Sequence, residues 1–306
     1  MVFTVGLTGL GKIGMGFESD PLRAKPASHL GALKALKDEL TLQYVRDVNP
    51  DLQRKAEEVY GSPVKFIDRT MDVLEEEVDV AVVATPPETH FSIVKLLAEN
   101  GGRRPKLIFC EKPLAETSGE AKDLVEICQA NNVSLTVNHS RRWDPAWHQI
   151  QRMITDKEEM GKLLFIHGLY SGDTMNVGVH MADLVNWFGA PKHSVSRIDA
   201  SYLVFKLTVY GEKKIVRLAC NGGEVGFYNV KKSDRYQDIK EPVRSSSDDS
   251  ILNLSLYEQF AGLPKTSPML NAYRNIVAHL SHGIPLECNG EDGVKAVQLV
   301  EQWCRA

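Results

Sequence analysis

The sequence predicts an α/β protein of two domains: a doubly wound parallel sheet, followed by an α/β domain with a mostly antiparallel sheet. Apolar runs alternate with helical segments through the first half of the chain, and a glycine-rich turn follows the first run. Alternating strands separated by glycine turns occupy much of the second half. The chain of 306 residues has room for two domains. We expect the first at residues 1–138 and the second at residues 139–306.

Six short segments of the first half read as strands, and several of them are nearly continuous in apolar residues, as is typical of strands that are covered on both faces. They are residues 3–8, 42–46, 64–67, 78–84, 107–110 and 135–137. Helical patterns lie between them, at residues 28–40, 50–61 and 118–132. The first helix places Leu30, Leu33, Leu36 and Leu40 on one stripe, and the last has Ser118 as its expected cap. This alternation predicts right-handed crossovers and a ligand site beyond the carboxyl ends of the strands.

The first strand leads into the sequence GLGKIG, which contains Gly9, Gly11 and Gly14 with Lys12 and Ile13 between the last two. In such a turn one glycine permits the tight bend, the next lets the backbone approach a pyrophosphate, and the third lets the helix pack close to the strand. The amino end of the helix favours the anion. We therefore expect these five residues to line a dinucleotide site. The alternative is a glycine-rich turn without a ligand.

The second strand ends at Asp47, whose carboxylate can accept hydrogen bonds from both hydroxyls of an adenosine ribose. An acid at this position repels a 2′-phosphate and so favours NAD, whereas the neighbouring Arg46 leaves NADP open. Asp47 follows Gly14 by 33 residues, against about 20 in the standard pattern. We attribute the excess to an insertion at residues 17–28. The alternative is that Asp47 only begins the turn that follows it.

The fourth strand ends at Thr85, and two prolines follow. Prolines force an extended turn and donate no backbone N–H groups. We therefore expect Thr85, Pro86 and the loop through His90 at the carboxyl edge of the sheet, near the nicotinamide half of the cofactor. A second interpretation gives His90 only the role of a cap for the next helix.

The fifth strand delivers Glu111, Lys112 and Pro113 to the same edge. A lysine there can hydrogen-bond a reacting hydroxyl and stabilise its oxygen as hydride leaves the carbon. The proline fixes the backbone behind the lysine, and Glu111 can hold the turn or tune the lysine. The alternative is a solvated Glu-Lys pair on a loop. The glycine turn and the proline-containing loop at the same edge favour the catalytic interpretation.

The second half begins with NHSRRWDP, residues 138–145. Arg141 and Arg142 place positive charge after the sixth strand, which suits a substrate hydroxyl, carboxylate or phosphate, or an anchor for the domain junction. Apolar spacing predicts a helix over residues 178–189 that ends at a glycine. His180 lies near its start, as a catalytic candidate or as a helix-cap histidine.

The chain resembles the glucose–fructose oxidoreductase and inositol dehydrogenase family, Gfo/Idh/MocA, over nearly its whole length. The resemblance rests on the order of the segments GLGKIG, VRDVNP, ATPPETH, CEKPLAET, NHSRRWDP, GVHMADLVNWFG and GEDGVKAVQLVE. It implies a Rossmann domain followed by an α/β domain with a large, mostly antiparallel open sheet. It also implies NAD(P)-linked oxidation or reduction at a carbon of a sugar, cyclitol or related polyol, and homodimers or homotetramers commonly assembled through the open sheet. It places Asn138 and Arg141 by the active site.

The resemblance further pairs Lys112 with a histidine, here His180, at the reacting hydroxyl. The family carries an aspartate four residues before this histidine, where the present chain has Asn176. An asparagine can orient a hydroxyl but cannot take its proton. General-base work is then expected from His180 or Lys112, or Asp173 substitutes from three residues earlier.

Further strands are expected at residues 161–172, 194–199, 202–211, 213–220 and 223–231, with turns at glycines between several of them. Residues 241–250 read as a polar loop. Amphipathic helices are expected at residues 271–283 and 291–305, where we interpret Tyr273 and His279 as packing residues.

The composition limits the class of partner. The net charge of −4 provides no strong field toward nucleic acid or an acidic membrane. No apolar run reaches the roughly 18 residues of a membrane helix, and the first residues lack the pattern of an export signal. Five cysteines without a CxxC pair indicate reduced thiols and no structural metal. We expect a cytoplasmic protein.

Together these patterns predict an NAD(P)-dependent oxidoreductase that transfers hydride between nicotinamide and a carbon of a sugar, sugar nucleotide, sugar phosphate or cyclitol. Two other classes stay open. One is a sugar-modifying enzyme that holds its nucleotide tightly without net turnover. The other is a non-catalytic sensor on the same scaffold that binds a dinucleotide and a protein partner. The presence of Lys112 and His180 argues against the sensor.

Overall fold

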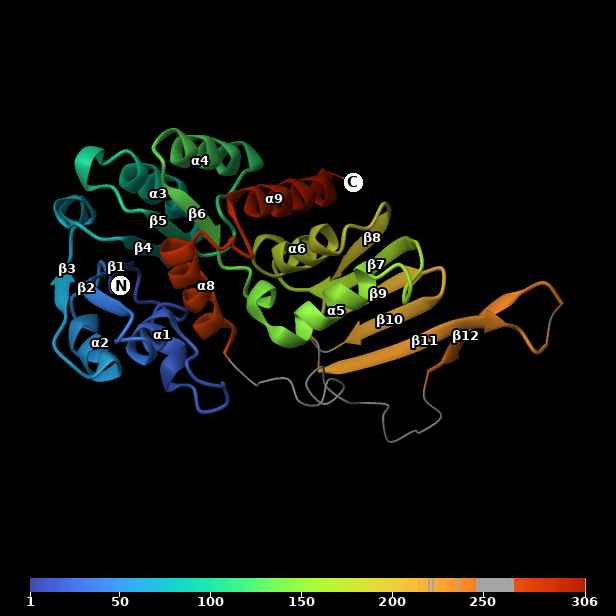
Figure 1. Ribbon diagram of the computed structural model, residues 1–306. Helices are drawn as coiled ribbons and strands as arrows, with labels where there is room; N and C mark the ends of the chain where they lie inside the picture. The colour runs from blue at the N-terminus through green and yellow to red at the C-terminus, as the bar shows by residue number, and fades with distance from the viewer. Residues whose placement is uncertain (220, 222, 236, 246–266, 306) are drawn as a thin grey trace. The chain divides into compact units, whose positions relative to one another are not determined.

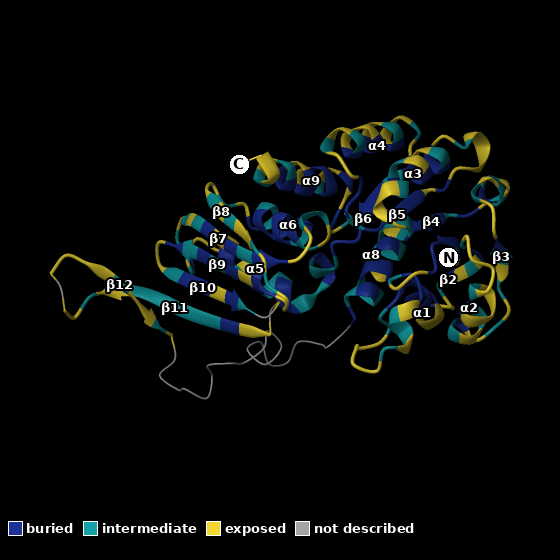
Figure 2. Ribbon diagram, turned by 180° about the vertical axis from the view of Figure 1, so that it is seen from behind, coloured by how far each residue is buried: buried dark blue, intermediate teal, exposed yellow. Residues whose placement is uncertain are grey.

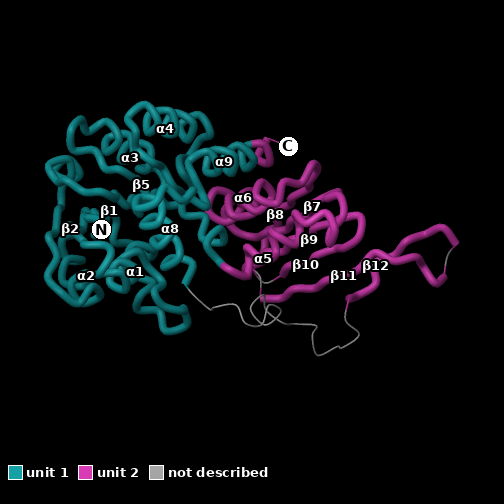
Figure 3. The backbone as a smooth tube through the Cα atoms, in the orientation of Figure 1, with its two compact units in different colours: residues 1–144, 266–301 teal, residues 145–265, 302–306 magenta. Residues whose placement is uncertain are grey.

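The structure is a computed structural model that describes residues 1–219, 221, 223–235, 237–245 and 267–305 (Figure 1). The chain divides into two compact units (Figure 3). The first contains Met1–Asp144 and Thr266–Glu301, and the second contains Pro145–Lys265 and Gln302–Ala306. The chain therefore leaves the first unit after about half its length and returns to it before its end.

The first unit is built on a six-stranded sheet in the order β3-β2-β1-β4-β5-β6 (Figure 1). Its strands are β1 (Phe3–Thr8), β2 (Leu40–Arg46), β3 (Lys65–Ile67), β4 (Val80–Val83), β5 (Leu107–Cys110) and β6 (Ser134–Val137). All neighbouring strands run parallel. The central strands are almost wholly buried, which is why their sequences are continuous apolar runs (Figure 2). The strand order reverses between β1 and β4, where such sheets bind ligands.

Helices cover both faces of this sheet (Figure 1). Helix α1 lies against α2, and α3 lies against α4. The bounds are α1 (His29–Ala35), α2 (Leu52–Tyr60), α3 (His90–Ala98), α4 (Ser118–Ala130), α8 (Pro268–His282) and α9 (Gly290–Arg305). Short helical turns are η1 (Gly16–Ser19), η2 (Thr70–Glu75), η3 (Pro87–Thr89), η4 (Gly101–Arg103) and η5 (Ser140–Trp143). The doubly wound parallel sheet predicted from the sequence is confirmed.

Two helix ends differ from the prediction. The leucine stripe does not continue to Leu40, because α1 ends at Ala35 and a tight turn follows, in which the N–H of Leu40 donates to the carbonyl oxygen of Leu36 at 2.8 Å. Leu40 is buried as the first residue of β2 instead. The cap of α4 is Thr117, which has extended backbone and forms a capping box, whereas Ser118 is already helical.

Helix α8 and α9 as far as Glu301 belong with the first unit, whereas the expected boundary at residue 138 places them in the second domain. Trp143 joins the two parts of this unit, since its indole nitrogen donates to Asn275 at 3.1 Å and its carbonyl accepts from Asn271 at 3.0 Å. The buried face of α8 completes the core of the first unit with Met269, Ala272, Tyr273 and Ile276. An amphipathic pattern shows that a helix has a buried face, but it does not show which core that face covers.

The second unit is built on a six-stranded sheet in the order β12-β11-β10-β9-β7-β8. Its strands are β7 (Leu163–Ser171), β8 (His193–Ile198), β9 (Phe205–Gly211), β10 (Lys214–Ala219), β11 (Glu224–Lys232) and β12 (Lys240–Arg244). Only β7 and β8 pair in parallel, and a crossover through η6 (Thr174–Gly178) and α6 (Val179–Phe188) connects them. Helix α5 (Pro145–Thr155) packs against α6. The mostly antiparallel sheet predicted for this half is confirmed.

Strand β12 occupies part of the segment for which the sequence suggested a polar loop. It pairs with β11 from Arg244 opposite Tyr228 to Lys240 opposite Lys232. An edge strand tolerates charged side chains and a proline such as Pro242, so its composition resembles that of a loop. Residues 246–250 of the expected loop lie outside the described residues.

Neither a membrane helix nor a metal centre is found in the part of the chain that the structure describes. No described helix has both the length and the apolar composition needed to cross a bilayer. No three described His, Cys, Asp or Glu side chains are grouped so that they would hold a metal ion.

Asp79, just before β4, connects three segments at the amino edge of the parallel sheet. Its Oδ2 accepts hydrogen bonds from the backbone N–H and the hydroxyl of Thr4 at 2.8 and 3.0 Å, and its Oδ1 lies 2.8 Å from Nζ of Lys106. Burial acts to raise the pKa of Asp79, but the hydrogen bonds from Lys106 and Thr4 outweigh it and lower the pKa below its usual value. The ionised carboxylate therefore stabilises the folded state.

We expect Asp79→Asn to lower the free energy of unfolding at pH 7 by about 1–2 kcal/mol, because it removes a hydrogen-bonded charge. A lowered carboxyl pKa contributes stability above the unfolded value, near 3.8, and this stability is lost as the pH falls through the folded value. Urea unfolding at pH 7 and near pH 3 should therefore show a deficit that shrinks in acid. Asp72→Asn is the control, because that carboxylate is 43% exposed and 3.9 Å from Arg69. An equal deficit at both pH values would contradict the assignment.

Candidate dinucleotide and active site

The residues that follow four neighbouring strands lie in one row at the carboxyl edge of the parallel sheet. Each donates its backbone N–H to a carbonyl oxygen at the end of the strand beside it in the sheet. The donor and acceptor residues are Gly9 and Arg46 (2.8 Å), Ala84 and Thr8 (2.7 Å), Glu111 and Val83 (2.8 Å), and Asn138 and Cys110 (2.8 Å). The glycine turn, the proline-containing loop and the Glu111–Lys112 turn therefore share one edge, at the reversal of strand order.

The glycine turn has the shape that a pyrophosphate needs. Gly9 has a φ of 100°, and a Cβ there would lie 2.4 Å from the carbonyl oxygen of Ala84. A Cβ on Gly14 would lie 2.0 Å from the carbonyl oxygen of Gly9. At Gly11, in contrast, an added Cβ meets no atom within 4 Å. The first and third glycines thus shape the turn, while the second leaves open space beside its backbone that fits a phosphate.

The glycine turn leads into a first helical turn, and α1 continues this turn after the chain has made an excursion away from the helix. The backbone N–H groups of His29 and Leu30 donate to the carbonyl oxygens of Ile13 and Gly14, at 3.0 and 2.9 Å. Met15 still donates to the carbonyl oxygen of Gly11 at 3.0 Å, and His29 takes the place that residue 17 would have in a continuous helix. The excursion therefore occupies residues 17–28, the insertion inferred from the sequence.

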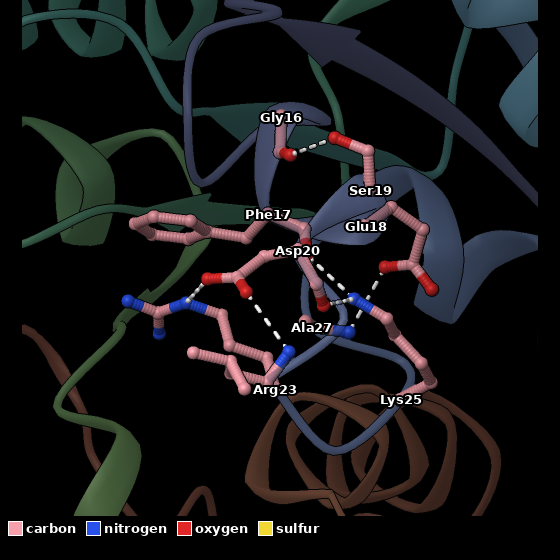
Figure 4. A network of polar contacts seen from close by, with 9 residues as sticks. Gly16, Phe17, Glu18, Ser19, Asp20, Arg23, Lys25 and Ala27 are labelled. Carbon is pink, nitrogen blue, oxygen red and sulfur yellow. Dashed lines mark hydrogen bonds and ion pairs between the residues drawn. The ribbon is translucent and has the colours of Figure 1, made fainter.

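The excursion is held by its own side chains (Figure 4). Nζ of Lys25 donates to the carbonyl oxygens of Phe17 and Asp20, both at 2.7 Å. The guanidinium of Arg23 pairs with Asp20 at 3.2 Å and lies 3.7 Å from the centre of the Phe17 ring. The carboxylate of Glu18 accepts a backbone N–H at the far end of the segment at 2.9 Å. These contacts give the insertion a defined path back to α1.

Asp47 lies just beyond β2 and contacts the glycine turn. Its Oδ2 accepts the backbone N–H of Leu10 at 2.7 Å, and its Oδ1 accepts that of Asn49 at 3.0 Å. Asp47 therefore both begins the turn after β2 and lies at the glycine loop. An ionised carboxylate has about four lone-pair sites, so about two remain for ribose hydroxyls. Without the 12 residues of the excursion, Asp47 would follow Gly14 by 21 residues, close to the standard spacing of about 20.

The loop after β4 places His90 between two turns of the edge. Its Nδ1 lies 2.7 Å from the carbonyl oxygen of Pro113, and its Nε2 lies 2.9 Å from that of Thr85. The imidazole is fully buried. His90 thus holds the proline-containing loop against the Glu111–Lys112 turn, a role that neither sequence interpretation included. Contact of Thr85 and the exposed Pro86 with the cofactor stays a prediction.

Glu111 is the centre of a buried hydrogen-bond network beside Lys112. Its Oε1 lies 3.0 Å from Nε2 of His29 and 2.5 Å from Nδ2 of Asn138, and its Oε2 lies 3.3 Å from the backbone nitrogen of Lys112. Nδ1 of His29 lies 2.9 Å from the hydroxyl of Tyr273. Apart from Lys112, these residues are at most 6% exposed. The network connects α1, β5, β6 and α8 behind the backbone of the lysine.

Glu111 is ionised in this network. Burial acts to raise the pKa of Glu111, but the hydrogen bond and charge of His29, the hydrogen bond of Asn138 and the charge of Lys112 outweigh it and lower the pKa. Burial raises the pKa of the Tyr273 hydroxyl well above its usual value, and the negative charge of Glu111 adds to this effect. The site therefore holds a fixed negative charge next to the lysine.

The sequence does not mark His29 or Tyr273 as site residues. The excursion of residues 17–28 separates His29 along the chain from the glycine turn that it follows in space. Tyr273 lies on α8, more than 160 residues after Glu111 along the chain. The available signal is weak: both carry a polar group on an otherwise apolar stretch of helix, and such groups usually find a partner when buried.

The residues after β6 have different surroundings. Arg142 is buried, and its guanidinium lies 3.4 Å from both the Asp292 carboxylate and the carbonyl oxygen of Glu287. It therefore anchors the segment at the start of α9. Arg141 is half-buried, and its contact with substrate stays a prediction. Oδ1 of Asn138 is buried without a hydrogen-bond partner among the described residues, which leaves one acceptor at the edge for a ligand.

Asp173, Asn176 and His180 belong to the second unit. Asp173 precedes η6, and its carboxylate accepts the backbone N–H of Asn176 at 2.7 Å. His180 lies in the first turn of α6, four residues after Asn176, so the two side chains are on one side of consecutive helical turns. The predicted meeting of His180 with Lys112 joins one unit to the other and stays a prediction.

The glycine turn, the acid after β2 and the order of the parallel strands define a dinucleotide-binding Rossmann domain. Residues 3–139 match the model of a family described as "Oxidoreductase family, NAD-binding Rossmann fold". The model is that of the Gfo/Idh/MocA family, so residues 3–139 are similar to the NAD-binding domain of the family that the order of motifs predicted. NAD is the cofactor that the family description names.

Curated relatives share parts of the chain. The rhizopine catabolism protein MocA of Rhizobium meliloti is 25% identical over 234 residues, which cover 72% of this chain and 67% of that protein. The scyllo-inositol 2-dehydrogenase (NAD(+)) of Bacillus subtilis is 33% identical over 126 residues, which cover 41% of this chain and 34% of that enzyme. The matches thus span about a third to two thirds of these relatives.

Solved structures share the fold along the whole chain. A levoglucosan dehydrogenase in complex with NADH has a TM-score of 0.75 at 15% identity, covering 100% of this chain and 96% of that one. The WlbA dehydrogenase from Bordetella pertussis, in complex with NADH and UDP-GlcNAcA, has a TM-score of 0.71 at 17% identity, covering 98% and 94%. At these identities the likeness shows the fold alone.

We expect Gly11→Ala to weaken NAD binding about tenfold or more, because its methyl group would enter the space that fits the pyrophosphate. Its free energy of unfolding should change little, since the added Cβ meets no protein atom within 4 Å. Gly14→Ala should instead lower the thermal midpoint by several degrees, because its Cβ meets the carbonyl of Gly9. Calorimetric titration with NAD and thermal unfolding separate the two effects.

Gly102→Ala is the matched control. An added Cβ at Gly102 also meets open space, but this glycine lies in η4, away from the glycine turn. Neither NAD binding nor stability should change. Unaltered NAD affinity in Gly11→Ala would remove Gly11 from the cofactor site.

Proposed function

We propose that this chain is an NAD-dependent oxidoreductase that acts at a hydroxyl-bearing carbon of a sugar, cyclitol, sugar nucleotide or sugar phosphate. The observation that carries the proposal is the position of Lys112 at the carboxyl edge of the parallel sheet, in the same row as the glycine turn. The curated relatives support it, because one is named for dehydrogenation of scyllo-inositol with NAD(+). Bound NAD would supply the hydride acceptor or donor.

In this proposal the ammonium of Lys112 donates a hydrogen bond to the substrate oxygen. It stabilises negative charge on that oxygen while the C–H bond breaks or forms. The fixed carboxylate of Glu111 lies behind the lysine backbone and supplies the opposite charge. The buried Oδ1 of Asn138 offers an acceptor to a cofactor or substrate donor, and Arg141 offers a cation to the substrate.

The proton of the hydroxyl would pass to His180. Asn176 cannot take a proton, so it orients the substrate. The carboxylate of Asp173 caps η6 by accepting the backbone N–H of Asn176. This existing role supports His180 over Asp173 as the base. The same proposal includes NAD in preference to NADP, because Asp47 would repel a 2′-phosphate. It also includes the cytoplasmic location expected from the composition and the homo-oligomer expected from the resemblance.

Lys112→Ala should lower kcat/KM by about 10²–10⁴-fold with the best substrate from a panel of cyclitols, sugars and sugar nucleotides, because it removes the group that contacts the reacting oxygen. NAD binding, measured by calorimetric titration, should change by much less. Lys122→Ala is the matched control, because Lys122 lies on α4, is 66% exposed and pairs with Glu126 of the same helix at 3.7 Å. A Lys112→Ala enzyme as active as the parent on every substrate would end the proposal.

A further inference from the structure

The carboxylate of Glu111 is held more firmly than a turn requires. It is buried, with the residue 6% exposed, although it is charged. Burying a charge is costly unless hydrogen bonds and opposite charge replace the lost water. Asn138 supplies one hydrogen bond from β6, and His29 supplies another from α1.

The imidazole of His29 is fixed on several sides. An ionised carboxylate only accepts hydrogen bonds, so Nε2 of His29 carries the proton that it donates to Glu111. Nδ1 lies 2.9 Å from the hydroxyl of Tyr273. The rings of Phe109 and Tyr273 meet the imidazole edge-on, at 5.2 and 5.8 Å between centroids. A fully buried ring with these contacts has one orientation.

His29 also connects the two halves of the proposed site. Its backbone N–H donates to the carbonyl oxygen of Ile13 in the glycine turn at 3.0 Å, and its side chain contacts Glu111 beside Lys112. One residue therefore ties the turn that fits the pyrophosphate to the turn that carries the lysine.

Among the titratable groups around the imidazole, Glu111 and Lys112 are the charged ones. Tyr273 approaches from α8, and Glu111 and Cys110 lie at the end of β5, with Lys112 next in the chain. Burial raises the pKa of Tyr273 and of Cys110, so both stay neutral at neutral pH. Tyr273 is also fully buried. The chain of contacts therefore holds charge in place; it does not lead a proton to solvent.

We propose that His29 is a positioning residue that keeps the carboxylate of Glu111 ionised and in place, and thereby sets the charge that Lys112 meets. The inference rests on the proposed function only in giving Lys112 contact with the substrate oxygen. Without the His29 donor, a buried carboxylate shifts toward its neutral form. The lysine then loses part of its counter-charge and gives up its proton at lower pH.

The test uses the full chain without substrate or cofactor. Trace labelling with acetic anhydride over a pH series, followed by mass spectrometry, gives the pH midpoint at which Lys112 becomes reactive. We expect His29→Leu to lower this midpoint by about one pH unit. His29→Gln retains an N–H donor and should restore most of the parental midpoint. Glu111→Gln removes the counter-charge and should shift the midpoint in the same direction.

His279→Leu is the matched control. His279 is a histidine of α8 in the same unit, but its nitrogens lie 3.0 Å from the Ser134 hydroxyl and 2.8 Å from the Ile284 carbonyl oxygen. Glu111 is not among the partners of these two nitrogens, so the Lys112 midpoint should stay at the parental value. Equal shifts in His29→Leu and His279→Leu would show general loosening of the unit and would overturn the inference.

Tyr273→Phe decides the case if His29→Leu does not fold. It frees one side of the imidazole while leaving the His29 donor present, so a smaller shift in the same direction is expected. A parental midpoint in the folded His29 variant, or in Tyr273→Phe where that variant is needed, overturns the proposal.

A catalytic readout follows where the substrate panel yields turnover. His29→Leu should lower kcat and move its pH profile to lower pH, with a smaller change in KM for NAD. Failure of the proposed function is seen separately, as absent NAD binding by the parent or full activity in Lys112→Ala. Neither result depends on the labelling midpoint.

Discussion

An ionised carboxylate without water is the constraint around which the first unit is organised. Glu111 follows a fully buried strand, and its charge persists because His29 of α1 and Asn138 after β6 donate hydrogen bonds that replace those of water. The start of α1 is therefore fixed, because His29 has to reach Glu111. Helix α8 is fixed in turn, because Tyr273 has to reach the imidazole of His29. The same contacts that satisfy the carboxylate fix the backbone from which Lys112 projects. Stability and the proposed chemistry thus depend on one set of hydrogen bonds.

The excursion between Gly14 and His29 shows how a helix can be continuous in space but not in sequence. The first backbone hydrogen bonds of α1 go to the carbonyl oxygens of Ile13 and Gly14, and the inserted segment of 12 residues is closed by the contact of Lys25 with Asp20. The spacing from the glycine turn to Asp47 then becomes ordinary. An unusual interval in a motif therefore reflects an added loop rather than a different site.

The two units divide the proposed work. The family match covers residues 3–139, which carry the glycine turn, Asp47 and Lys112. Asn176 and His180 lie in the second unit, beyond this match. Fold and cofactor do not specify the substrate of such a protein. In the proposed function, side chains of the second unit do. Asn176, which is proposed to orient the substrate, is therefore a residue at which to begin the search for that substrate.

Local signals in the sequence determined the parallel sheet, the glycine turn and the row of candidate residues at its carboxyl edge. Strand pattern, glycine spacing and the Glu111–Pro113 turn each depend on a few neighbouring residues, and strand ends of a parallel sheet necessarily meet at one edge. Tertiary structure decided the end of α1, the assignment of α8 to the first unit, the two bonds of His90 and the partners of Glu111. These depend on contacts between residues far apart in the chain. A buried charge can select such partners only after the fold has removed water from around it.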